Sequence, residues 1–433
     1  MRENTRRASI LLGAFMIFVL LMGAIVPLFQ TNVNTPLPVE PTVAPTPTFP
    51  APPADLQTIA FDRLYLHPTG LFAIGQPTGW EPSTPLTEPN RAAITMVNAD
   101  ALSVIEASVE QSNPPLFSLE QLDARFNDTY LATSWSRYGD WTETTRRVED
   151  NQLVLDFALE LNRQTYVARQ VSWLEDGSIY TIRVVTPNNA TDLLVYVLDN
   201  LVTTLQPFRQ FADTPVNWSA YYDTVANHII RYPQEWVVED SAPGRPATIV
   251  APDGTTLRLE ALPNTTVSSD ADAEAWALDA HPNATVLSVA PVQQGDASGS
   301  SVAYSFTTVD GEPQSGLAVL LNGADGTLHV ADLRFNASSV DLNRALDEET
   351  AEATAEATEA PAVDTGENEA LLAQVMQTFV ILPPLNLSTA EATPTPLPTV
   401  ATQEATEAPT EEADETDVAA DDAEATAEAT EGD

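Results

Sequence analysis

The chain has 433 residues and a formal net charge of -44, and it contains no cysteine. All 18 of its basic residues are arginine. The lack of cysteine excludes disulfides, thiolate catalysis and zinc-thiolate sites. The lack of lysine excludes a Schiff base, a P-loop lysine and a Ser-Lys dyad. The acidic balance argues against nucleic acid as a partner, because nucleic-acid binding needs a basic surface.

An uncharged apolar segment at residues 9–29 is long enough to cross the roughly 30 Å hydrocarbon core as a helix. Three arginines lie within residues 1–8, and the next basic residue is Arg63. This asymmetry predicts a cytoplasmic N-terminus, a signal anchor in the cell membrane and an extracytoplasmic remainder. A cleaved secretory signal is the alternative. We favour the anchor because signal cores run to about 7 to 15 residues.

Three further segments have the composition of connecting or unfolded chain. Residues 30–57 are rich in proline and threonine, which predicts a semi-rigid extended linker. An acidic insert at about 346–368 and a tail at 385–433 share the sequence AEATAEATE. Both are poor in large apolar side chains, so we expect them to be disordered. Transient helical turns are the alternative, because alanine and glutamate favour helix.

Between these segments the chain carries one order of predicted elements twice, over residues 58–210 and 211–384. Each copy begins with a strand and a Pro-x-x-Trp turn, which should deliver Trp80 or Trp236 to the core. A hairpin, a helix, three antiparallel strands and a closing amphipathic helix follow. This repetition indicates a duplication in which each copy, at roughly 150 residues, can bury its own core.

The helix of the first copy begins at a capping box, Ser118 to Gln121, and its apolar spacing predicts that it continues through Phe126 to Tyr130. Its counterpart should run from Ser269 to Ala280. A group of aromatic residues follows the first helix: Trp135, Tyr138 and Trp141. We interpret this group as a small core under a loop, with an exposed docking patch as the alternative.

The sequence offers no recognisable chemistry. Its four histidines lie far apart, and none has the spacing of a metal-binding pair. His228 falls on a predicted strand and is interpreted as a core or edge residue. Asp270, Asp272 and Glu274 alternate as in a calcium loop, but the glycine and distal glutamate are missing, which favours a helix start. We therefore predict no catalytic, cofactor-binding or metal-ligating residue and no cofactor.

The order of elements resembles the Mog1/PsbP-like fold, here in tandem. The residues that carry the resemblance are structural: Phe72, Pro77 and Trp80 in the first copy, and Ile230, Pro233 and Trp236 in the second. The resemblance implies an α+β class in which helices cover both faces of an antiparallel sheet. It also implies docking to a larger partner, but it carries no functional residue over to this chain.

We therefore expect a single-pass membrane protein whose two α+β domains form a binding or assembly module. It would contact the bilayer through residues 9–29 and another extracytoplasmic or membrane protein as its partner. The alternatives are an extracytoplasmic hydrolase with a site between the domains, or a passive surface spacer. A deep polar cleft in which two carboxylates, or a histidine and a carboxylate, converge would favour the hydrolase; shallow apolar patches rimmed by polar residues would favour docking.

Overall fold

The computed structural model describes residues 48–344 and 367–387. The predicted segments 1–8 and 9–29, most of the linker, and nearly all of the insert and tail lie outside these residues. Within the described residues, no helix has the length and apolar character to cross a membrane. The described chain belongs to the α+β class, with antiparallel sheets and separate helices. We call residues 48–211 the first half, and residues 212–344 with 367–387 the second half.

The first half contains an eight-stranded antiparallel sheet of order β3-β5-β6-β10-β9-β8-β7, with β4 also paired to β5, and a small sheet of order β1-β2-β11. Its strands are β1 Arg63–Leu66, β2 Phe72–Gln76, β3 Glu81–Pro82, β4 Leu86–Glu88, β5 Arg91–Asn98, β6 Ser103–Gln111, β7 Asp140–Glu149, β8 Gln152–Leu161, β9 Gln164–Glu175, β10 Ser178–Pro187 and β11 Gln206–Pro207. Its helices are η1 Leu56–Thr58, α2 Leu119–Arg125, α3 Asp128–Ser134, α4 Thr191–Thr204 and η2 Arg209–Phe211.

The second half has sheets of order β14-β15-β16-β20-β19-β18-β17 and β12-β13-β21. Its strands are β12 Ser219–Tyr222, β13 His228–Tyr232, β14 Val237–Asp240, β15 Ala247–Val250, β16 Thr256–Leu262, β17 Thr285–Gln294, β18 Ala297–Thr307, β19 Pro313–Asn322, β20 Leu328–Phe335 and β21 Val380–Ile381. Its helices include α5 Asp270–Ala280 and α7 Glu367–Gln377. Apart from β4, the strands of its two sheets follow the same order as those of the first half.

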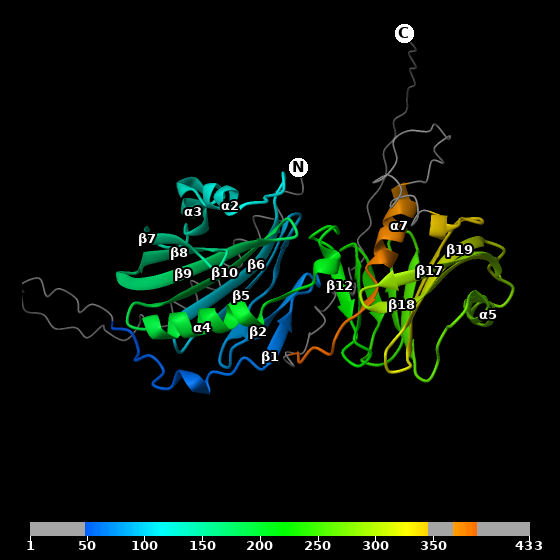
Figure 1. Ribbon diagram of the computed structural model, residues 1–433, viewed down its shortest axis with the longest axis horizontal. Coiled ribbons are helices and arrows are strands. Elements are labelled where there is room, and N and C mark those ends of the chain that lie inside the picture. The colour runs from blue at the N-terminus through cyan, green and yellow to red at the C-terminus, as the bar shows by residue number, and fades with distance from the viewer. Residues whose placement is uncertain (1–47, 345–366, 388–433) are drawn as a thin grey trace, which may run out of the picture. The chain divides into compact units, whose positions relative to one another are not determined.

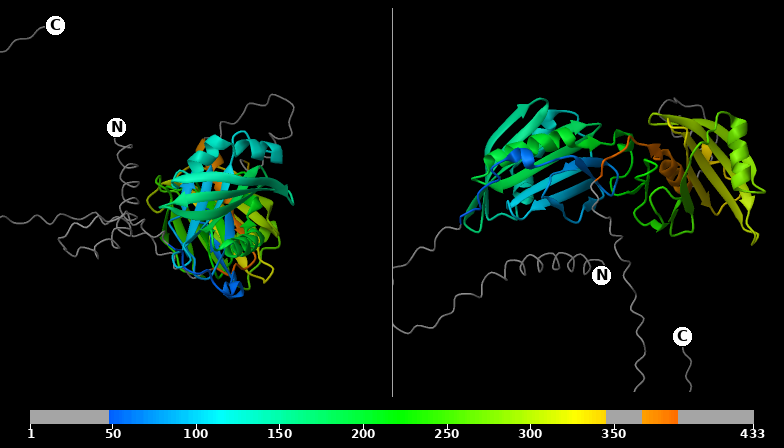
Figure 2. Two further views of the ribbon diagram at one scale, coloured as in Figure 1. Left: turned by 90° about the vertical axis from the view of Figure 1, so that its left-hand side faces the viewer. Right: turned by 90° about the horizontal axis from the view of Figure 1, so that it is seen from below.

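Helices cover both faces of each large sheet. In the first half, buried α4 residues such as Leu194 and Leu198 pack with Trp80 on one face, and α2 and α3 pack with β8 residues such as Phe157 on the other. Figures 1 and 2 show α4 and the α2–α3 pair on different sides of this sheet. In the second half, α7 and Trp236 share one cluster, and α5 packs on the opposite face.

The structure confirms the core position of both predicted tryptophans, because Trp80 is 2% exposed and Trp236 is 6% exposed. The capping box at Ser118 is also confirmed. The prediction that its helix continues to Tyr130 was wrong, since α2 ends at Arg125 and α3 begins at Asp128. The reason is Asn127, whose side chain accepts the backbone N–H groups of Thr129 and Tyr130 and so starts a new helix.

The prediction of three strands after each helix was also wrong, because each half has a fourth, β7 or β17, at the edge of its sheet. No residue of either edge strand is fully buried, and in β7 exposed and half-buried residues largely alternate. The loop assigned to the aromatic residues therefore includes part of β7, where Trp141 lies. The core interpretation of these residues holds: Trp135 is buried, and Tyr138 and Trp141 pack against the same cluster.

Candidate functional site

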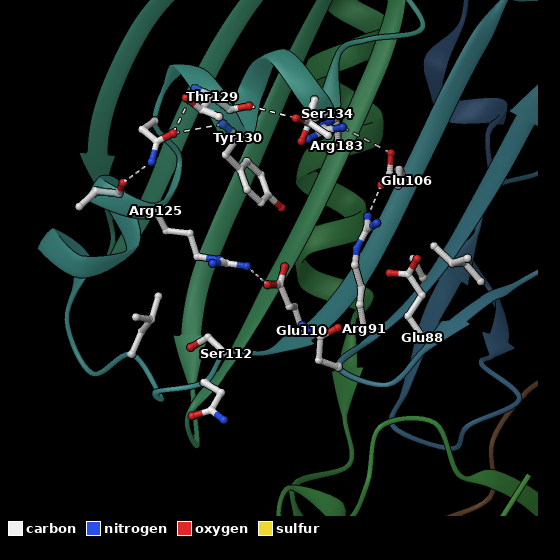
Figure 3. Close-up of a pocket in the computed structure, with 18 of the residues that line it drawn as sticks. Glu88, Arg91, Glu106, Glu110, Ser112, Arg125, Thr129, Tyr130, Ser134 and Arg183 are labelled. Carbon is white, nitrogen blue, oxygen red and sulfur yellow. Dashed lines mark hydrogen bonds and ion pairs between the residues drawn. The ribbon is translucent and has the colours of Figure 1, made fainter. Parts of the chain in front are cut away.

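A polar pocket of about 1210 Å3 lies in the first half. Its floor is formed by β5, β6 and β10, and its walls by β4, α2, α3 and the loop that follows β6. Figure 3 shows side chains from these elements projecting into the same space. Its ionisable lining residues include four arginines and three glutamates: Arg91, Arg125, Arg137, Arg183, Glu88, Glu106 and Glu110.

Strand alternation explains why these charged groups share one face. On β5, Ala92, Ile94 and Met96 are buried in the core beneath α4, so Arg91 and the other odd-numbered residues face the opposite side. On β6, Ile105, Ala107 and Val109 belong to the same core, so Glu106 and Glu110 also face the pocket. Since α2 and α3 pack over β8, β9 and β10, the polar parts of β5 and β6 are left to line the cavity.

Glu106 is the centre of the network, because three guanidinium groups surround its carboxylate. Arg91 Nη2 donates to Glu106 Oε1 at 2.5 Å, and Arg137 Nη2 donates to Oε2 at 3.1 Å. Arg183 Nη1 lies 3.5 Å from Oε2. Arg183 is the direct cross-strand neighbour of Glu106 between β10 and β6. The positions of these charges are therefore set by the sheet and by the turn that follows α3.

Arg183 is held from several sides. Its Nε and Nη2 atoms donate to Gln170 Oε1 at 3.2 and 2.8 Å, from the neighbouring strand β9. Its guanidinium carbon lies 4.2 Å from the centroid of the Trp135 ring, a cation-π contact. Only 7% of its side chain is exposed. This arginine is therefore a fixed positive charge at the base of the pocket.

The environment keeps Glu106 ionised. Burial alone would raise the pKa of its carboxyl, but Arg183, Arg91 and Arg137 outweigh burial and hold that pKa below its ordinary value. Burial lowers the pKa of Arg183, with Glu106 opposing the shift. At neutral pH the cluster thus contains one carboxylate and three guanidinium groups.

A second ion pair lies on the α2 side of the pocket. Arg125, in the last turn of α2, donates to Glu110, and Figure 3 shows the two side chains pointing toward each other. Tyr130 projects from α3 into the space between this pair and the Glu106 cluster. Burial and the nearby Glu110 raise the pKa of the Tyr130 hydroxyl, so it stays protonated at neutral pH.

Two further groups of ionisable side chains lie in the second half. His228 and His329 are both buried, and their Nδ1 atoms are 3.3 Å apart. His281 Nε2 lies 3.1 Å from Asp332 Oδ2, and Tyr304 donates to the other oxygen of Asp332. The His281 ring also stacks on Tyr304. These groups are packed into the interior, where they satisfy one another's hydrogen bonds.

From the sequence we predicted no residue of the pocket and expected the histidines to be isolated from one another. The structure confirms His228 as a core residue but pairs it with His329, across 101 positions of sequence. The acidic triplet at 270–274 does begin a helix, and Asp272 accepts from Ser268 there. No group of three or more potential metal ligands occurs in the described residues. A usable signal was present in β6, where Glu106, Ser108 and Glu110 alternate with the buried apolar residues Ile105, Ala107 and Val109.

Comparisons with known proteins find neither a matching family model nor a matching curated protein. Solved structures similar to part of the chain include cyanobacterial PsbP (CyanoP) from Synechocystis sp. PCC 6803, with 13% identity and a TM-score of 0.25 over 34% of this chain and 95% of that protein. A protein from Bacteroides thetaiotaomicron VPI-5482 has 10% identity and a TM-score of 0.25 over 34% of this chain, and the match spans 49% of its own length.

A third similar structure is the type VI secretion immunity protein TplEi of Pseudomonas aeruginosa, which was solved with a peptide named "L". It has 10% identity and a TM-score of 0.20, over 70% of this chain and 98% of that protein. At such TM-scores these similarities carry no argument about activity or partner. The assignment of a function to this chain therefore rests on its own residues.

Proposed function

We propose that this protein is an extracytoplasmic binding module whose ligand site is the polar pocket of the first half. The observation that carries the proposal is the Glu106 cluster, where three arginines share one carboxylate at the base of an open cavity. The three guanidinium groups carry two more positive charges than this one carboxylate balances. A ligand that accepts hydrogen bonds from these arginines would offset the rest.

The pocket geometry favours binding over hydrolysis. Glu106 and Glu110 both line the pocket, but they are four residues apart on one strand, or roughly 13 Å along it. Each carboxylate is also paired with arginine, and the lowered pKa of Glu106 makes it a poor proton donor.

We further propose where the protein lies in the cell and how its chain divides into domains. Residues 9–29 anchor the chain in the cell membrane, with the bulk of the protein extracytoplasmic. Residues 58–210 and 211–384 form two Mog1/PsbP-like domains, and the matching strand order of the two halves supports the duplication. The partner is another extracytoplasmic or membrane protein, and the linker at 30–57 holds the binding module away from the bilayer.

Site-directed photo-crosslinking in intact cells tests the binding site. A photoreactive residue replaces Thr129, which lines the pocket, and a control probe replaces Val309, a fully exposed residue of the β18–β19 turn. We expect a discrete crosslinked species from position 129 that is absent from position 309. The second substitution Arg137→Gln should weaken that crosslink. Equal crosslinking from both positions, or none from position 129, would contradict the proposal.

A further inference from the structure

We propose that the ligand of this pocket is an extended acidic polypeptide segment, one carboxylate of which is bound by Arg91 and Arg137 beside Glu106. This inference rests on the proposed function and specifies the chemistry of the ligand. It follows from the charge count of the pocket, from the hydrogen-bond donors that remain there and from the edge of the sheet beside it.

The ionised side chains of the pocket sum to a net positive charge at its base. Arg125 and Glu110 form an ion pair and cancel. Around Glu106, three guanidinium groups face one carboxylate, a surplus of two positive charges. Glu88, on the exposed β4–β5 hairpin, returns one negative charge at the rim. In a chain with a net charge of -44, this is a local site for an anion.

Hydrogen-bond donors remain on the same arginines. A guanidinium group has five N–H donors in a planar fork that matches a carboxylate. In the described structure Arg91 and Arg137 each donate one side-chain hydrogen bond, in both cases to Glu106. Their side chains are 27% and 51% exposed. Each can therefore donate hydrogen bonds to a second carboxylate while it keeps its bond to Glu106.

The surroundings of the arginines favour a polypeptide as the carrier of that carboxylate. Strand β4 lines the pocket and pairs only with β5 among the described strands. An edge strand of this kind can pair with an added extended chain. Leu86 on β4 is 42% exposed, and Phe117, which follows the lining residue Leu116, is 79% exposed. These exposed apolar side chains, one on the edge strand and one on the loop before α2, suit the alternating side chains of an extended peptide.

The size of the pocket agrees with such a ligand. Its volume of about 1210 Å3 is far larger than one inorganic anion needs, and it exceeds the roughly 300 to 1,000 Å3 of ordinary small-molecule sites. Asparagine, serine and threonine side chains line much of the remaining wall. These groups can donate to and accept from peptide amides.

The test uses the full chain in detergent micelles and fluorescence anisotropy. The probe is a fluorescein-labelled peptide in which glutamate alternates with valine or serine, and the control peptide has glutamine at every glutamate. Arg137→Gln is the pocket variant. Its matched control is Arg258→Gln, because Arg258 is 49% exposed and pairs with one glutamate at 2.9 Å, against 51% and 3.1 Å for Arg137.

We expect the acidic peptide to bind and the glutamine peptide to bind on the order of fivefold or more weakly, since charge-assisted hydrogen bonds are lost. Arg137→Gln should weaken binding of the acidic peptide to a similar extent, and Arg258→Gln should leave it unchanged. Thermal melting confirms that each variant is folded. Arg137 is half exposed, so its replacement leaves the core intact.

Four results would overturn the inference. Equal binding of the two peptides, or an unchanged affinity in Arg137→Gln, would remove the role of the carboxylate. Displacement of the acidic peptide by inorganic phosphate at low millimolar concentration would assign the site to a phosphate. Binding of an oligogalacturonate but not of the peptide would assign it to an acidic sugar. If photo-crosslinking from position 129 still succeeds in cells, only the ligand class is wrong and the proposed function stands.

Discussion

The fold controls the charge state of its buried histidines. His67 is fully buried; its Nδ1 accepts from the backbone N–H of Thr69 at 3.2 Å, and its Nε2 lies 3.2 Å from the carbonyl oxygen of Ala93. This arrangement requires a neutral ring with its proton on Nε2. Burial lowers the pKa of His67 to about 4. Burial, together with His329, lowers the pKa of His228 to about 4.

A pH dependence of stability follows. The ordinary histidine pKa of about 6.5 applies to the unfolded chain, so the unfolded state binds more protons than the folded state between pH 6.5 and 4. The stabilisation is therefore complete above pH 6.5 and is lost as the pH falls toward 4. We expect His67→Gln to reduce the loss of unfolding free energy between pH 7 and pH 4 by about 3 kcal/mol.

Denaturant unfolding at several pH values, followed by tryptophan fluorescence, checks this prediction. The control is Ser172→Ala, which replaces a buried polar side chain that does not titrate. That variant should be less stable than the wild type at every pH but show the same acid dependence. If His67→Gln loses as much stability on acidification as the wild type, the buried ring does not carry the effect.

Among the elements, the Pro-x-x-Trp turn is the one that both halves build in the same way. The N–H of Trp80 donates to the carbonyl oxygen of Pro77 at 3.0 Å, and Trp236 makes the same bond to Pro233. Each turn directs its indole between the sheet and the helix of its own half, α4 or α7. The turn thus links a local sequence motif to the packing of the closing helix.

We expect Trp80→Ala and Trp236→Ala each to lower the free energy of unfolding by roughly 3 to 5 kcal/mol, because each leaves a cavity in the core. Trp141→Ala is the comparison, since Trp141 is half-buried on the edge strand β7, and it should cost less. Urea unfolding of the three variants gives the values. Near-wild-type stability of both core variants would show that the turn does not anchor its half.

The elements also show what could be predicted from the sequence. Strands buried on both faces, such as β8 and β10, have dense apolar runs, so they were found along with the closing helices. The edge strand β7 was missed because it has no apolar run, and β17 was missed because Ser288 and Pro291 interrupt its apolar residues. The helix break at Asn127 was missed because the apolar spacing of Phe126 and Tyr130 continues across it.

The candidate site could not be predicted from the sequence, for a different reason. Arg91, Glu106 and Arg183 lie on three strands, and they meet only because β6 pairs with both β5 and β10. The alternation on β6 places Glu106 and Glu110 on one face, but the register that places Arg183 opposite Glu106 is a property of the sheet. Pairing across 77 positions of sequence leaves no local spacing to recognise.

For the whole molecule, the charges act on an anionic ligand differently at long range and at short range. The net charge of -44 repels anions at a distance. At physiological salt this repulsion is screened over about 8 Å, so remote carboxylates act weakly on a ligand already in the pocket. The arginines around Glu106 lie within hydrogen-bonding reach of such a ligand and are screened less. Long-range repulsion therefore limits the rate of association, and the local cluster decides whether an acidic ligand stays bound.

The proposed membrane topology can be tested by proteolysis. Residues 9–29 carry no charge, whereas Arg2, Arg6 and Arg7 precede them, so the N-terminus should stay in the cytoplasm. Protease added to intact cells, or to spheroplasts where an outer barrier exists, should digest the chain beyond about Gln30 and leave a membrane-embedded N-terminal fragment. A cytoplasmic marker protein that stays intact confirms that the membrane is sealed. Full protection of the chain, or a soluble species that begins near Ile25, would contradict the anchored topology.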